Sequence, residues 1–118
     1  MFVFSISIIT EPISRDFLKK IAVEGFGDMV KAVVDCERRT MAIGAELHAD
    51  EEQTLLADGS KQENLWGINL YPDRLDETWI VFNSMINIRP RQNNRTRSVE
   101  DPKLQTMIRS FVQELIPS

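Results

Sequence analysis

Amide and guanidinium side chains are dense between Asn83 and Arg97, where four asparagines and four arginines follow an apolar stretch. Arginine presents a planar fork of N–H donors, and asparagine presents both donors and an acceptor. Such groups bind phosphates, carboxylates or backbone carbonyls. The segment therefore predicts either an anion-binding loop or a long loop that the same side chains hold to its own domain.

The position of this segment favours an anion. It ends just before a predicted helix, and the amino end of a helix carries a partial positive charge. We expect Arg89 and Arg95 to hold the anion, while Asn83 and Asn87 orient it. The full set of predicted ligand-binding residues is Asn69, Asn83, Asn87, Arg89, Asn94 and Arg95.

Glu46, His48 and Asp50 place two carboxylates and an imidazole at alternate positions. On a continuous strand all three would point one way, as in a metal site or a general acid and base. Simpler roles compete, because Asp50 suits a helix cap and Glu46 suits a cross-strand partner of Lys31. The chain has one histidine, so we predict no metal site and name Glu46 and His48 as candidate catalytic residues.

Three helices are predicted around these residues. Residues 15–24 carry an apolar stripe after the cap Ser14, and Gly25 ends the helix. A second helix begins at Asp50 and ends at 58–59. A third begins at Asp101 and Pro102 and has the strongest apolar periodicity.

Strands are predicted at residues 1–9, 29–36, 41–48, 65–71 and 79–89 from apolar and β-branched residues bounded by turn residues. The order is β-α-β-β-α-β-β-α. We therefore predict a single α+β domain over residues 1–118, with a mainly antiparallel sheet of four to five strands and helices packed on one face.

Side-chain alternation assigns the faces of this sheet. With Cys36 opposite Met41, Lys31 lies opposite Glu46 and Val34 lies opposite Ile43. The face opposite the apolar one then holds these polar residues: Lys31, Asp35, Glu46, His48, Asn69, Tyr71, Asn83, Asn87 and Arg89. That face is either a floor for a ligand or the ordinary solvated side of an antiparallel sheet.

Composition narrows the class of protein. The 118 residues are 42% hydrophobic and 27% charged, as in a soluble domain. A net charge of −4 disfavours a duplex nucleic-acid binder, and the arginine-rich segment lacks the aromatic residues that RNA-binding surfaces use. One cysteine, no basic signal segment and no apolar stretch of membrane-spanning length lead us to expect a cytoplasmic protein.

Four blocks of the sequence resemble a family of small prokaryotic proteins known as a domain of unknown function. The blocks are FGDMVKAVVD, GAELHADEE, LLADGSKQENLWGINLYPD and FNSMINIRPRQNNRTRSVEDP. The resemblance covers most of the chain from about residue 9 and implies that the polar residues above belong to a family pattern. It implies no activity.

Two functional hypotheses follow. The first is a binding domain or small enzyme that takes a small anionic ligand on the polar face and the arginine loop; the cofactor is unknown. The second is a protein–protein interaction or self-association module without catalysis, such as a homodimer, with Trp66, Trp79 or Tyr71 as anchors. No serine has a recognisable triad context, and no glycine-rich phosphate loop, CxxC or HExxH motif occurs.

Overall fold

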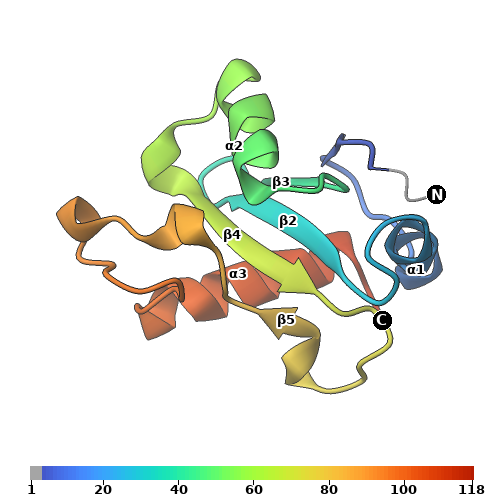
Figure 1. The fold of residues 1–118 in the computed structure, drawn as a ribbon. Coiled ribbons are helices and arrows are strands. Elements are labelled where there is room, and N and C mark those ends of the chain that lie inside the picture. The colour runs from blue at the N-terminus through green and yellow to red at the C-terminus, as the bar shows by residue number, and fades with distance from the viewer. Residues whose placement is uncertain (1–3) are drawn as a thin grey trace.

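Five strands form one antiparallel sheet in the spatial order β1-β3-β2-β4-β5 (Figure 1). The structure is a computed structural model and describes residues 4–118. The strands are β1 (Ser7–Ile9), β2 (Val30–Asp35), β3 (Thr40–Ile43), β4 (Leu65–Leu70) and β5 (Ile80–Val81), and the helices are α1 (Arg15–Glu24), α2 (His48–Ala57) and α3 (Pro102–Leu115). The predicted α+β class and element order are confirmed. Residues 1–3 of the first predicted strand lie outside the described residues.

The main core lies between the sheet and helices α1 and α3. Ala32, Val34 and Ile68 from the sheet pack there with Leu18 of α1 and Phe111 of α3, and all five side chains are buried. Both helices begin as predicted: the Ser14 hydroxyl accepts from the Phe17 N–H at 3.0 Å, and the Asp101 carboxylate accepts from the Lys103 N–H at 2.9 Å.

Helix α2 packs on the opposite face of the sheet, so the expectation that all helices share one face is corrected (Figure 1). Its Leu55 packs against Val33, Ala42 and Leu65, which alternate with the residues of the main core. Because these side chains are apolar, that face needs a cover. The sheet is thus sandwiched there, and only part of the predicted polar face is available to a ligand.

Strand β3 is shorter than predicted because Gly44 turns the chain away after Ile43. Gly44 has φ +96°, and a Cβ at this position would lie 2.3 Å from the Ser5 carbonyl oxygen. Only glycine fits such a conformation and approach. The chain therefore enters α2 at His48, two residues before the predicted start at Asp50, and residues 46–48 are not on a strand.

The β2–β3 register differs from the predicted one by two residues. Val34 lies opposite Met41, and the Gly44 N–H donates to the Lys31 carbonyl, so the predicted pairing of Lys31 with Glu46 does not form. The Asp35 carboxylate accepts from the backbone N–H of residues 37 and 38 and tightens the turn. Since a shift of two residues preserves side-chain direction, the predicted apolar face of the hairpin is unchanged.

Strand β5 also ends early, and side chains replace its missing part along the edge of β4. The buried Asn87 amide accepts from the Gly67 N–H at 2.8 Å and donates to the Gly67 carbonyl at 2.9 Å. The Arg89 guanidinium donates to the Leu65 carbonyl at 2.6 Å. The predicted strand over residues 79–89 is therefore reduced to Ile80–Val81. Beyond it, loop side chains form the hydrogen bonds to the β4 backbone that a neighbouring strand would otherwise form.

Candidate anion site beside helix α2

A cavity of about 230 Å³ lies where the amino end of α2 meets β2, β4 and the loop after β5. We call it the α2 pocket. It is lined by Lys31, Leu47, His48, Ala49, Asn69, Asn83, Ser84, Met85, Ile86 and Arg97. Lys31 and Asn69 are opposite one another in the β2–β4 register, on the face that α2 covers. The pocket therefore occupies the uncovered remainder of the predicted polar face.

The imidazole of His48 forms one wall of this pocket and is 8% exposed. Its Nε2 lies 2.8 Å from the Ile68 carbonyl oxygen. Because a carbonyl only accepts, Nε2 carries the proton, and the Nδ1 of a neutral ring keeps its lone pair. The side chain is thus fixed in one orientation with one acceptor nitrogen.

The His48 ring favours its neutral form. Burial lowers its pKa, and the positive charges of Lys31 and Arg97 lower it further. The Ile68 carbonyl and the Asn69 amide, which can accept from a protonated ring, act in the opposite direction with smaller effect than burial. The cations Lys31 and Arg97 therefore lie near the His48 wall of the pocket.

The start of α2 adds further donors. Leu47 is the N-cap residue and provides no side-chain hydrogen bond to the first turn. Residues 47–49 all line the pocket, so the uncapped, partly positive end of the helix faces it. Glu51, in the same turn, is fully buried, and burial raises its pKa well above the usual value, so its carboxyl group favours the neutral form.

Asn69 lies at the base of the pocket and is 8% exposed. Its Nδ2 donates to the Asn83 backbone carbonyl at 3.1 Å, which fixes the orientation of the amide. Its Oδ1 is buried and has no hydrogen-bond partner within residues 4–118. An unpaired buried carbonyl is costly, so this oxygen is a position where a donor would be stabilising.

The structure brings His48, Asn69 and Asn83 together, but not the other predicted site residues. Asn87 and Arg89 bond backbone atoms of β4, as described above. Asn94 is buried; its Nδ2 donates to the carbonyls of Asn87 and Ser98, and its Oδ1 accepts from the Glu100 N–H. These three side chains organise the loop internally, as the second interpretation of the sequence expected.

Two of the predicted residues lie on the surface away from the pocket. Glu46 and Arg95 are exposed, and neither lines the α2 pocket. The predicted acid and base pair of Glu46 and His48 is therefore not assembled. Because His48 and Asp50 are helical, the strand spacing assumed for a metal site does not hold, and residues 4–118 contain no group of three His, Cys, Asp or Glu placed to hold a metal.

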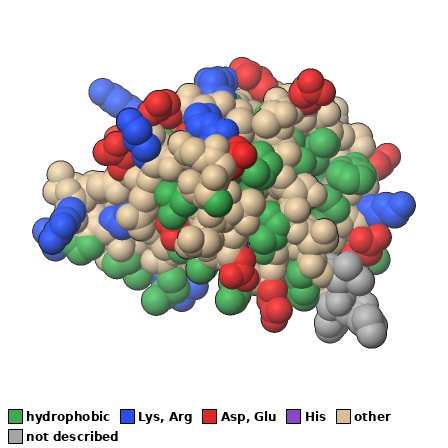
Figure 2. Space-filling model, turned by 90° about the horizontal axis from the view of Figure 1, so that it is seen from above, with side chains coloured by type: hydrophobic (Ala, Val, Ile, Leu, Met, Phe, Trp, Pro, Cys, Tyr) green, Lys and Arg blue, Asp and Glu red, His purple; other side chains and the backbone are tan. Residues whose placement is uncertain are grey.

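Lys31 and Arg97 are the pocket residues that the predicted ligand-binding set omitted. Side-chain alternation had placed Lys31 on the polar face, and it does face the same side of the sheet as Asn69. Arg97 belongs to the arginine-rich segment, but sequence alone does not show which of its arginines lines the pocket. Figure 2, a view from above, shows basic and acidic side chains interspersed and no visible histidine, in agreement with the burial of His48.

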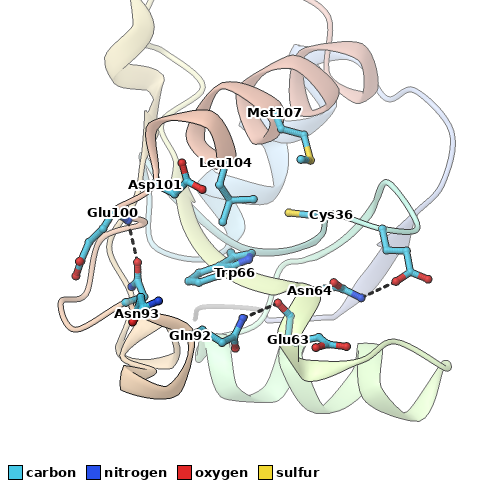
Figure 3. A pocket seen from close by; sticks show the side chains of 12 residues that line it. Cys36, Glu63, Asn64, Trp66, Gln92, Asn93, Glu100, Asp101, Leu104 and Met107 are labelled. Atoms are coloured by element: carbon cyan, nitrogen blue, oxygen red, sulfur yellow. Dashed lines mark hydrogen bonds between the residues drawn. The ribbon is translucent and has the colours of Figure 1, made fainter.

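A second, larger hollow of about 640 Å³ has the opposite charge (Figure 3). Trp66, Leu104 and Met107 provide apolar surface, and the lining carboxylates are Glu37, Glu63, Glu100 and Asp101. Burial, with the Asp35 charge, raises the pKa of the Cys36 thiol to about 12, so the thiol stays protonated and is a poor nucleophile at neutral pH. An anion would be repelled here, so the α2 pocket is the better candidate of these two for an anion.

Residues 7–115 match a family described as "Protein of unknown function (DUF5674)". The chain belongs to this family. Membership in a domain-of-unknown-function family, which the sequence blocks predicted, is confirmed. Comparisons with curated proteins and with solved structures found no match. None of the helices in residues 4–118 is long and apolar enough to cross a membrane.

The burial of neutral His48 predicts a pH-dependent stability. Since its pKa is lower in the folded protein than in the unfolded chain, stability from this group is present above the unfolded pKa of about 6.5 and is lost as pH falls through the lower folded pKa. His48→Gln removes this titration. Thermal melts between pH 7.5 and pH 5 should show wild-type protein losing stability relative to His48→Gln, whereas a constant difference would contradict the assignment.

Proposed function

We propose that this protein binds a small anionic ligand in the α2 pocket. The observation that carries the proposal is the convergence of Lys31, Arg97 and the uncapped amino end of α2 on one cavity. Each of these groups attracts negative charge. The single cysteine fits a reducing compartment such as the cytoplasm.

The Lys31 ammonium lies 5.2 Å from the Phe26 ring centroid, and no carboxylate of residues 4–118 neutralises it. Neither Lys31 nor Arg97 forms a salt bridge among the described residues. Both nevertheless act on the His48 ring, so they lie close to the same wall. In a chain of net charge −4, a local positive site of this kind concentrates anions against an acidic background.

The geometry supports binding more directly than catalysis. The neutral His48 ring offers one lone pair that could accept a proton, but the second carboxylate expected beside it, Glu46, does not line the pocket. A bound anion would contact donors from three elements at once. Recognition of a small anion is therefore the function that the pocket supports best.

The alternative, an interaction module, loses two of its expected anchors. Trp66 and Trp79 are 5% and 3% exposed and belong to the main core. Tyr71 is half-buried, and the Arg74 guanidinium stacks 3.8 Å from its ring centroid. A docking surface would instead have to use exposed apolar side chains such as Met85.

Removal of either pocket cation should weaken anion binding. We expect Lys31→Gln and Arg97→Gln each to lower the affinity for inorganic phosphate by about tenfold, since each removes one charge-assisted interaction. Isothermal titration calorimetry at low ionic strength measures this change. Arg91→Gln is the matched control, because Arg91 is exposed in the same loop but does not line the pocket. If wild-type protein and both pocket variants bind inorganic phosphate with equal affinity, the proposal is contradicted.

A further inference from the structure

The Asn69 side-chain oxygen has no donor within the described part of the chain, although Lys31, Arg97 and the amino end of α2 line the same pocket. Asn69 Oδ1 is buried and unpaired, and the bond from Nδ2 to the Asn83 carbonyl prevents the amide from presenting its NH₂ group instead. A purely anionic ligand would place acceptors against this oxygen. Such a ligand would satisfy the cations of the pocket and leave Asn69 Oδ1 unpaired.

The His48 imidazole lies within hydrogen-bonding reach of the Asn69 amide. Its Nε2–H is already donated to the Ile68 carbonyl. Its Nδ1 would donate only from a protonated ring, which burial and the charges of Lys31 and Arg97 disfavour. At neutral pH the pocket therefore presents two acceptors, Asn69 Oδ1 and the Nδ1 lone pair, beside its positive groups.

On the basis of the proposed function, we infer that the ligand of the α2 pocket carries a hydrogen-bond donor next to its negative charge. Hydrogen phosphate, a small phosphate ester with a free hydroxyl group, and a short hydroxy acid share this chemistry. The volume of about 230 Å³ is below the range of about 300–1,000 Å³ typical of pockets for drug-sized ligands, which restricts the ligand to a few carbon atoms.

A comparison of phosphate with sulfate distinguishes recognition of a hydrogen-bond donor from recognition of negative charge. Both are tetrahedral anions of similar size, but phosphate keeps at least one P–O–H group at neutral pH and sulfate keeps no O–H group. Sulfate carries the full double negative charge, so charge alone would favour sulfate. Tighter binding of phosphate than of sulfate would therefore show that the pocket recognises the P–O–H donor.

The experiment is a pair of calorimetric titrations at pH 7 and matched ionic strength, with inorganic phosphate and with sulfate. We expect wild-type protein to bind phosphate about tenfold or more tightly than sulfate, because a buried acceptor that stays unpaired weakens binding by about that factor. In Asn69→Leu the preference for phosphate should be lost, because leucine offers no acceptor to the P–O–H group. Glycolate and acetate form a second pair, which decides the question on wild-type protein if Asn69→Leu does not fold.

The two proposals fail in distinguishable ways. Sulfate binding to wild-type protein as tight as phosphate binding, or tighter, would overturn the donor inference and leave the anion site intact. Protonation of His48, which would supply Asn69 with a donor, would give this result. Binding of neither anion would overturn both proposals. A phosphate preference that persists in Asn69→Leu would also overturn the inference, since the donor would then be recognised elsewhere.

Discussion

Replacement of Asn87 by alanine is expected to lower the free energy of unfolding by about 3–4 kcal/mol, a large part of the stability of a domain this size. Asn87 is fully buried, and its amide bonds the Gly67 N–H, the Gly67 carbonyl and the Arg97 carbonyl. Alanine would leave the Gly67 N–H and carbonyl unpaired and open a cavity, whereas the Arg97 carbonyl would keep its bond from the Ser84 N–H. Urea denaturation at pH 7 measures the change.

Asn83→Ala is the matched control for Asn87→Ala. Asn83 is another asparagine of the same loop, but its side chain is exposed, and the bond it offers to Asn69 uses its backbone carbonyl. We expect a change within about 0.5 kcal/mol. A loss below about 1 kcal/mol for Asn87→Ala would show that the amide does not act as the missing part of the β5 ladder.

The second large effect is expected for Gly67→Ala. In an exposed strand this substitution would stabilise slightly, because alanine loses less conformational entropy on folding. Here a Cβ would lie 2.5 Å from Ser84 Cβ and 2.6 Å from Ser84 Oγ. We therefore expect a loss of about 2–3 kcal/mol by overpacking.

A double-mutant cycle tests the stated cause of the Gly67→Ala effect. Ser84→Gly removes the two nearest atoms that a Cβ at residue 67 would meet, so the double variant should lose less stability than the sum of the single changes. Urea denaturation of all four proteins gives the coupling energy. Additive effects, or stabilisation by Gly67→Ala alone, would contradict the close approach of the loop to β4.

The sequence predicted the element order because local signals specify it. Ser14, Asp101 and Pro102 mark helix starts, and the alternation of Val30, Ala32 and Val34 marks a buried strand face. Strand ends were less predictable, since they depend on contacts between distant residues. Strand β3 ends where Gly44 meets the Ser5 carbonyl, and β5 ends where side chains take over its hydrogen bonds.

Residue type likewise identified only part of the candidate site. Asn69 and Asn87 have the same side chain. Asn87 nevertheless bonds the Gly67 backbone of β4, whereas Asn69 keeps an unpaired oxygen in a pocket. Arg89 turns to the backbone, whereas Arg97, eight positions on, lines the pocket. Such differences are set by the path of the loop, which periodicity does not encode.

The most direct test of the anion site is an NMR titration of ¹⁵N-labelled protein with inorganic phosphate. We expect the largest amide shifts at His48 and Ala49, with further shifts at Asn69 and Arg97, and little change in the acidic hollow near Trp66. Shifts confined to the exposed arginines of residues 91–95, or no saturable shift at His48 and Ala49, would contradict it.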